Sequence, residues 1–207
     1  MPTDLPVFLV VTWLLAMSPG PGQALMVRQT LAGGRRLAWA STAGHATGLL
    51  VWSTAAAAGL SAILLANPTG YLAVRVVGGL VLFGLGANTL LGLRRPGVAS
   101  SAAGPGGSTG FWGGYTVGLT ANLGNLKAGA FAISVLPQFV TATGPVLLSS
   151  VALGVIWALV TVCWYLFFTW ALDRGRALLT RPAVDRGLRL ATGGVLLVLG
   201  VSVAAGL

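Results

Sequence analysis

Six runs of mostly apolar residues, each long enough to cross a bilayer as a helix, constrain the fold of this chain more than any other feature. A transmembrane helix needs about 20 such residues, and a soluble domain usually has about 25% charged residues. Only 7% of the 207 residues here are charged. The sequence therefore predicts an all-α integral membrane protein with six transmembrane helices. The predicted spans are Leu5–Val27, Leu37–Leu65, Tyr71–Leu93, Phe111–Phe139, Pro145–Leu172 and Leu188–Leu207.

Basic residues collect at alternate connections between these spans. Ten of the twelve follow spans one, three and five, namely Arg28, Arg35, Arg36, Arg94, Arg95, Arg174, Arg176, Arg181, Arg186 and Arg189. The positive-inside rule makes that side cytoplasmic and places the N-terminus and the C-terminus outside. The net charge of +9 could also suggest a nucleic-acid-binding protein. The arginines flank apolar runs, however, so we interpret them as setting the orientation in the membrane.

The chain divides into two three-helix halves, residues 1–98 and 111–207. The segment 99–110 between them is rich in Gly, Ser and Ala and predicts a flexible cytoplasmic linker. Because each half has an odd number of spans, the second enters the membrane in the opposite sense to the first. Inverted halves of this kind are common in secondary transporters, although this inference rests on topology alone.

The first span is interrupted by Ser18-Pro19-Gly20-Pro21-Gly22. Two prolines remove two backbone donors, and two glycines restrain the backbone little, so a straight helix is not expected. If helix resumes at Gln23, its free N–H groups and positive dipole end suit an anionic group such as an amino-acid carboxylate. The alternative is a loop at the inner membrane face, capped by Ser18.

The fourth span carries a polar segment in its middle, Asn122-Leu123-Gly124-Asn125-Leu126-Lys127. Polar groups inside a bilayer are costly and usually face a partner or a cavity. Asn122 and Asn125 share a face of a regular helix, whereas Lys127 joins them only if the helix opens, for which Gly124 offers a place. The alternative is a lysine that snorkels to the cytoplasmic interface.

Three further polar residues leave two interpretations each. His45 is either a histidine hydrogen-bonded between helices or a carrier of the coupling proton, since it titrates near neutral pH. Gln138 is either a polar group at the end of a span or part of a gate. Arg75 is expected to snorkel to the outer interface more readily than to form an ion site.

No metal or cofactor site is expected. The single cysteine, Cys163, lies in an apolar run and is predicted to be a small buried residue. It has no partner for an intramolecular disulfide and no Cys/His cluster around it. Gly44 and Gly48 in the second span most simply allow close helix packing.

Two motifs resemble those of a known family. Ser18-Pro19-Gly20-Pro21-Gly22, followed by Ala43-Gly44 and Thr47-Gly48, resembles the N-terminal signature of the LysE/RhtB family of amino-acid exporters. The segment Asn122 to Lys127, ending in Leu136-Pro137-Gln138-Phe139, resembles the second signature of that family. The resemblance covers essentially the whole chain. It departs from the family at Leu126, where relatives have a proline.

The resemblance implies a secondary exporter of amino acids or related metabolites, driven by the proton motive force. It also implies a multi-pass homodimer in a bacterial cytoplasmic (inner) membrane. The substrate would bind between the halves, to Ser18, Pro19, Gly20, Pro21, Gly22, Gln23, Asn122, Asn125 and Lys127. His45, Lys127 or a proton on the substrate itself would couple transport to protons, because none of the three carboxylates lies in the middle of a span. The same lack of carboxylates favours neutral amino acids as cargo.

Two other classes of protein compete with this interpretation. A membrane-embedded enzyme would need a catalytic constellation, and one histidine, one cysteine and no carboxylate within a span supply none. A structural or assembly subunit without transport activity would have no need of polar breaks in the first and fourth spans. The sequence therefore favours a transporter.

Overall fold

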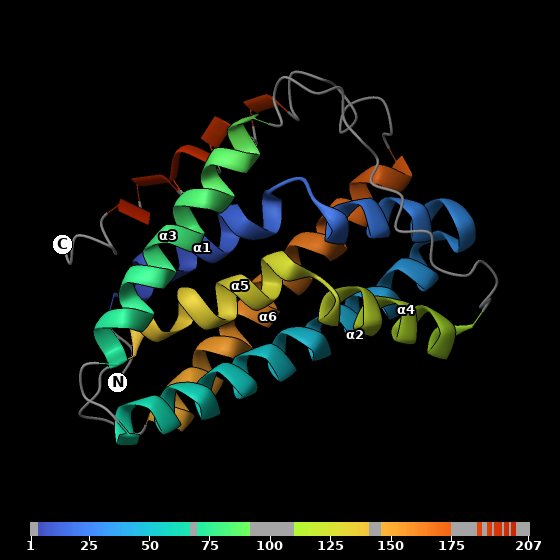
Figure 1. Ribbon diagram of the computed structural model, residues 1–207. Coiled ribbons are helices and arrows are strands. Elements are labelled where there is room, and N and C mark those ends of the chain that lie inside the picture. The colour runs from blue at the N-terminus through green and yellow to red at the C-terminus, as the bar shows by residue number, and fades with distance from the viewer. Residues whose placement is uncertain are drawn as a thin grey trace.

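The computed structural model of this chain is built from helices, and it describes residues 4–66, 70–91, 110–140 and 146–174, with scattered residues between 186 and 201. Figure 1 shows their arrangement. The helices are α1 (Leu5–Met17), α2 (Pro21–Ala66), α3 (Gly70–Leu91), α4 (Phe111–Leu123), α5 (Leu126–Ser134), the 3-10 helix η2 (Leu136–Phe139) and α6 (Val146–Arg174).

The predicted break in the first span is present between α1 and α2. Ser18 is extended, with φ −64° and ψ 127°, and the helices on either side of the break are bent by 52°. Helix resumes at Pro21, so the expected restart at Gln23 is wrong by two residues. A proline is well tolerated at the first helical position, because that position needs no N–H donor and the proline φ already suits a helix.

A second bend divides α2 at Gly33 and Gly34. Gly34 has φ 68° and ψ −168°, a backbone conformation that residues other than glycine rarely adopt. The bend lies between the predicted first and second spans, so α2 holds the end of one and the whole of the other.

The fourth span also opens where the sequence predicts it. α4 ends at Leu123 and α5 begins at Leu126, with Gly124 and Asn125 between them. The side chain of Asn125 caps α5 by accepting a hydrogen bond from the backbone N–H of Lys127 at 3.1 Å. This cap stabilises the restart of the helix at Leu126.

The number of spans stays a prediction. Among the described helices, α6 alone is long and apolar enough to cross a membrane, and α1 with Pro21–Gly59 passes the same test as one bent span. Residues 99–109, most of Leu188–Leu207 and the side chain of Arg75 lie outside the described residues.

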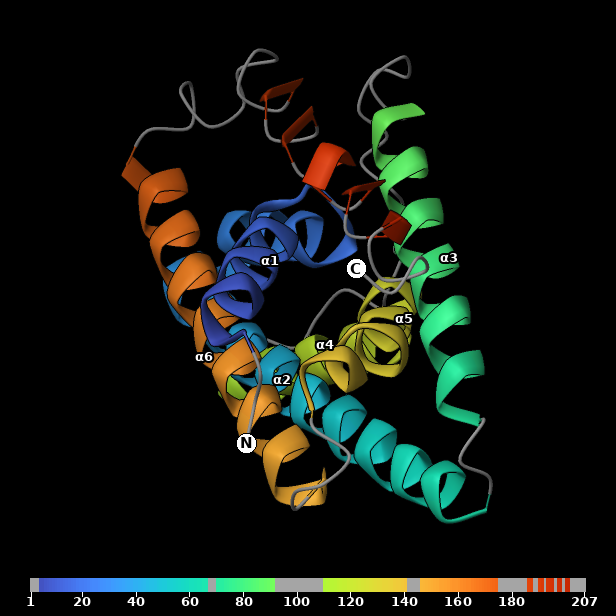
Figure 2. The same ribbon diagram turned by 90° about the vertical axis from the view of Figure 1, so that its left-hand side faces the viewer.

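Helices of the two predicted halves pack on one another, with α2 lying along both α4 and α6 (Figure 2). Glycines on α2 and α4 allow the closest approach, as predicted. A Cβ at Gly44 would lie 2.8 Å from the backbone nitrogen of Leu119, and one at Gly48 would lie 2.5 Å from Oδ1 of Asn122. Gly118 of α4 likewise packs against the backbone of Ser41.

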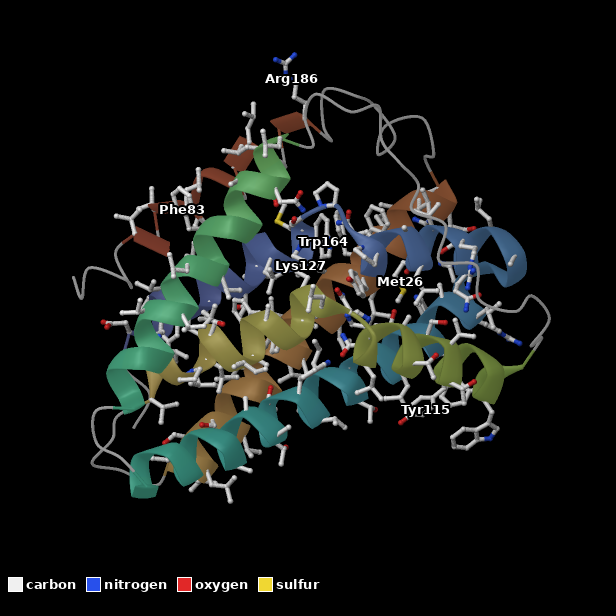
Figure 3. The ribbon with its side chains drawn as sticks, viewed as in Figure 1. Met26, Phe83, Tyr115, Lys127, Trp164 and Arg186 are labelled. Atoms are coloured by element: carbon white, nitrogen blue, oxygen red, sulfur yellow. The ribbon has the colours of Figure 1, made fainter. Side chains whose placement is uncertain are left out.

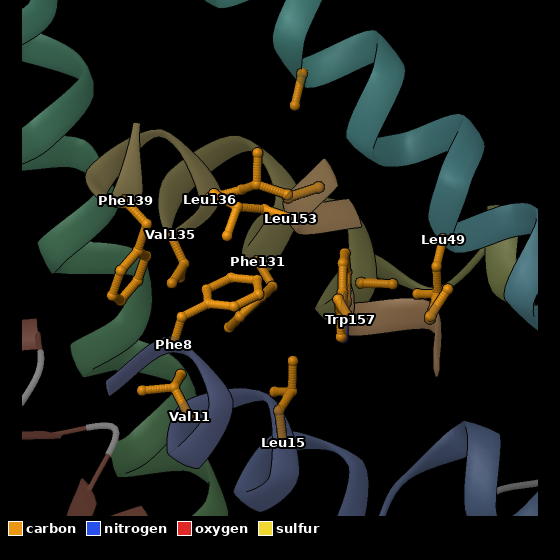
Figure 4. Packing of buried hydrophobic residues seen from close by; sticks show 14 of the residues in the cluster. Phe8, Val11, Leu15, Leu49, Phe131, Val135, Leu136, Phe139, Leu153 and Trp157 are labelled. Atoms are coloured by element: carbon orange, nitrogen blue, oxygen red, sulfur yellow. The ribbon is translucent and has the colours of Figure 1, made fainter. Parts of the chain in front are cut away.

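One hydrophobic core cluster lies between α1, α2, α5 with η2, and α6 (Figure 4). The ring of Phe8 meets that of Phe139 at 5.1 Å between centroids, and the ring of Phe131 meets that of Trp157 at 4.7 Å. Leu15, at the end of α1, belongs to this core. The break after α1 is therefore anchored on one side by packed aromatic and aliphatic side chains.

Cys163 lies on the exposed face of α6, so its predicted burial is wrong. α6 is mostly apolar from Val146 to Leu172, and its hydrogen-bonding side chains include Thr161, Tyr165 and Thr169. Cys163 is two residues away from both Thr161 and Tyr165, so it lies off the helix face on which those two side chains lie.

Candidate functional site

The two helix breaks meet at one cavity of about 40 Å³. α1 and the start of α2 contribute one wall, the α4–α5 junction a second, and α6 a third. The lining residues are Leu15, Ala16, Ser18, Gly20, Pro21, Gly22, Gln23, His45, Leu49, Asn125, Lys127, Ala128, Trp157, Thr161 and Tyr165.

Lys127 connects the two breaks directly. Its Nζ donates to the backbone carbonyl of Leu15 at 3.3 Å and lies beside Gly20. Figure 3 shows Lys127 near the middle of the helical assembly. The opening at Gly124 and Asn125 is what brings Lys127 to the cavity, because a continuous helix would turn it away from Asn125.

The start of α2 forms the opposite wall. Nε2 of Gln23 donates to the carbonyl of Met17 at 3.0 Å, which ties the first turn of α2 back to the end of α1. The hydroxyl of Ser18 is buried and has no hydrogen-bond partner among the described residues. The first turn of a helix also leaves backbone N–H groups unpaired, so this wall presents positive dipole and free donors to the cavity.

His45 reaches the cavity from the middle of α2. Its Nε2 lies 3.0 Å from Nδ2 of Asn122 on α4, and its ring meets that of Tyr165 edge-on, with centroids 5.2 Å apart. Nδ1 of His45 is buried without a hydrogen-bond partner in the described part of the chain. Because an amide Nδ2 can only donate, this arrangement requires Nε2 of His45 to be the unprotonated nitrogen.

The cavity brings together most of the predicted site residues. Eight of them line it: Ser18, Gly20, Pro21, Gly22, Gln23, His45, Asn125 and Lys127. Three do not. Pro19 lies in the break, Asn122 is fully buried behind His45, and Gln138 lies in η2, where its Nε2 donates to the carbonyl of Ser134 at 3.2 Å.

The sequence reasoning missed the wall that α6 supplies. Trp157, Thr161 and Tyr165 line the cavity from this helix. They follow one another at intervals of four residues, and Thr169 continues the series. Residues four apart share one face of a helix. A stripe of hydrogen-bonding side chains at that spacing, in an otherwise apolar span, was the available signal.

This lining suits a small polar cargo. It offers one ammonium, one imidazole and several neutral donors, and it contains no carboxylate. No group of three His, Cys, Asp or Glu side chains that could hold a metal occurs in the described part of the chain. A volume of about 40 Å³ admits groups the size of water. Since small-molecule pockets usually have about 300–1,000 Å³, a cargo molecule requires the walls to move apart.

Comparisons with known proteins agree with this architecture. A model of the LysE type translocator family matches residues 13–206. The chain is 22% identical over 201 residues to the uncharacterized membrane protein YrhP of Bacillus subtilis strain 168, and the match covers 94% of this chain and 95% of that protein. No solved structure matches the chain.

The family match extends over nearly the whole chain, so it includes both helix breaks and the cavity between them. LysE type translocators are membrane transporters and not enzymes, so the prediction of a membrane transporter is confirmed. The resemblance that the two motifs indicate is confirmed as well: the chain belongs to the LysE type translocator family.

Proposed function

We propose that this translocator exports neutral amino acids, or closely related small zwitterions, from the bacterial cytoplasm through the cavity between α1, α2, α5 and α6. The observation that carries the proposal is the meeting of the two helix breaks at Lys127, whose Nζ lies 3.3 Å from the carbonyl of Leu15. Each break comes from a different predicted half, as expected for a site at the interface of two repeats.

The charges around the cavity support the choice of cargo. Its lining has a cationic group in Lys127 and no carboxylate. An amino-acid carboxylate would find both the ammonium and the positive end of α2 there. A second positive charge on the cargo side chain would meet no opposite charge in the lining. Neutral amino acids therefore fit this site better than basic ones.

We also propose that export is driven by the proton motive force. His45 is the side chain best suited to carry the coupling proton, because an imidazole can both bind and release a proton and this one faces the cavity. Lys127, or a proton carried by the cargo, is the alternative carrier. Transport would proceed by rocking of the two halves around the cavity, in a multi-pass protein of the inner membrane with both termini outside. The homodimer that the family resemblance implies remains a prediction.

Efflux from preloaded cells tests the proposal. Cells that express the protein would be loaded with a panel of labelled amino acids, and release would be followed with and without an uncoupler. Lys127→Met, expressed to the same level, serves as the matched control. We expect release of neutral amino acids that exceeds the control and falls when the uncoupler is added. No efflux of any amino acid would overturn the proposal.

A further inference from the structure

The two prolines of the first break leave two particular carbonyls without their helical donors. In an α-helix the N–H of each residue pairs with the carbonyl four residues earlier. Pro19 and Pro21 have no N–H, so the carbonyls of Leu15 and Met17 cannot be paired in that way. An unpaired carbonyl at membrane depth must be satisfied by another part of the protein or by a cavity.

Two side chains take the place of the missing donors, and they differ in an informative way. Gln23 pairs with the carbonyl of Met17 from within the same segment, as a neutral group at 3.0 Å. Lys127 pairs with the carbonyl of Leu15 from the other half of the chain, as a cation at 3.3 Å. The first bond is a local cap, whereas the second joins α1 to α5 across the cavity.

The bond between Lys127 and Leu15 leaves unused hydrogen-bonding capacity on both partners. An ammonium has three donors, and the described residues offer Nζ of Lys127 this single acceptor. The lining of the cavity contains no carboxylate to balance its charge. Ser18 Oγ and His45 Nδ1, both buried and on the same lining, have no partner in the described part of the chain. The site therefore lacks an anion beside the lysine.

We propose that a zwitterionic cargo replaces the Lys127–Leu15 hydrogen bond and pairs with both of its partners. The cargo carboxylate pairs with the ammonium of Lys127, and the cargo ammonium donates to the carbonyl of Leu15. This inference rests on the proposed function and deepens it, because the site then selects for an ammonium and a carboxylate carried close together, as in an α-amino acid. In the empty protein the same bond keeps α1 and α5 together.

The replacement predicts how incomplete analogues behave. An amine without a carboxylate would take the Leu15 carbonyl but place a second positive charge beside Lys127. A carboxylic acid without an ammonium would pair with Lys127 but leave the Leu15 carbonyl buried and unpaired. Each fault should weaken binding by at least about tenfold relative to the complete zwitterion.

Competition in proteoliposomes tests this inference. Purified protein would be reconstituted, and uptake of a labelled neutral amino acid into liposomes preloaded with the same amino acid would be measured. The competitors are that amino acid, the amine obtained by removing its carboxylate, and the acid obtained by removing its ammonium. We expect the amine and the acid to compete at least about tenfold more weakly. Equal competition by either analogue would overturn the inference.

Two variants should change the selectivity in opposite directions. Lys127→Gln keeps a donor for the Leu15 carbonyl but removes the positive charge, so the amine should become a stronger competitor relative to the acid. Pro19→Ala supplies an N–H that can pair with the Leu15 carbonyl, so the acid should become a stronger competitor relative to the amine. A shift of both analogues in the same direction, in variants that melt as the parent does, would contradict the exchange. Cys163→Ser, on the exposed face of α6, serves as a neutral control.

The proposed function and this inference fail in distinguishable ways. A wild-type protein that carries no amino acid overturns both. A wild-type protein that carries amino acids but does not discriminate against the two analogues overturns the inference alone. The competition in the wild-type protein decides even if neither variant folds.

Discussion

Nε2 of His45 lies 3.0 Å from Nδ2 of Asn122, so a side chain that faces the cavity from α2 is held from behind by one on α4. In this pairing Asn122 donates, and His45 must be neutral at Nε2. A second proton on His45 would place two donors against each other. The Asn122 amide would then have to turn, so that its oxygen, which is unpaired among the described atoms, accepts instead.

His45→Gln should abolish uphill export while leaving expression and simple exchange of cargo largely intact. Glutamine can still accept from Asn122 but cannot titrate, so a cycle that depends on protonation of His45 stops. The measurement is pH-dependent export against a concentration gradient. Tyr165 of α6 meets this ring, and Lys127 of α5 lines the same cavity. An unchanged pH dependence in the variant would transfer the coupling to Lys127 or to the cargo.

Gly44→Ala should destabilise the protein by about 1–3 kcal/mol, as overpacking of a filled contact usually does. The added Cβ would lie 2.8 Å from the backbone nitrogen of Leu119, and backbone cannot yield as the end of a flexible side chain can. The free energy of unfolding would be measured by denaturant titration in detergent.

Gly59→Ala is the matched control for that measurement. Gly59 lies in the same helix, and a Cβ there meets nothing within 4 Å. We expect this control to be neutral or stabilised by up to about 1 kcal/mol, from the better helix propensity of alanine. Equal losses in the two variants would contradict a close backbone contact between α2 and α4 at Gly44.

Gly34→Ala should be destabilising for a different reason. A Cβ at Gly34 has open space around it, but the residue has a φ of 68°, and backbone conformations of this kind cost other residues about 1–3 kcal/mol. The loss of stability should persist in every substitution by an L-residue, whatever its size. A stability that falls with side-chain volume instead would point to a steric contact.

The sequence predicted the two helix breaks well because their causes are local. Pro19 and Pro21 cannot donate hydrogen bonds, and Gly124 is followed by Asn125, a residue that caps helices well. The restart of helix at Gln23 was wrong, because it did not allow for the preference of proline for the first helical position, which Pro21 occupies.

The pairing of the breaks was only partly predictable. Lys127 and Leu15 lie 112 residues apart, and no local pattern assigns a lysine to one particular carbonyl. The wall supplied by α6 was harder to predict, since its cavity-facing Tyr165 and its exposed Cys163 both lie in a mostly apolar run. The four-residue spacing of Trp157, Thr161 and Tyr165 marks one face of the helix, but the packing of that helix against α2 and α1 is not contained in the sequence of α6 alone.

Arg35 of α2 and Asp173 of α6 form an ion pair at the surface. Nε of Arg35 lies 3.1 Å from Oδ2 of Asp173, and the two side chains are 40% and 42% exposed. It joins α2, just beyond the bend at Gly34, to the end of α6. Because exposed pairs gain little from the Coulomb attraction, we expect a coupling energy of about 0.2–1 kcal/mol.

A double-mutant cycle with Arg35→Gln and Asp173→Asn measures this coupling energy as the non-additive part of the change in the free energy of unfolding. The coupling should shrink further when the salt concentration is raised, since salt screens charges at the surface. A coupling above about 2 kcal/mol that is insensitive to salt would mean that the pair is buried in the functional protein. In that case a partner or a further segment of the chain would have to cover the side of the molecule on which Arg35 meets Asp173.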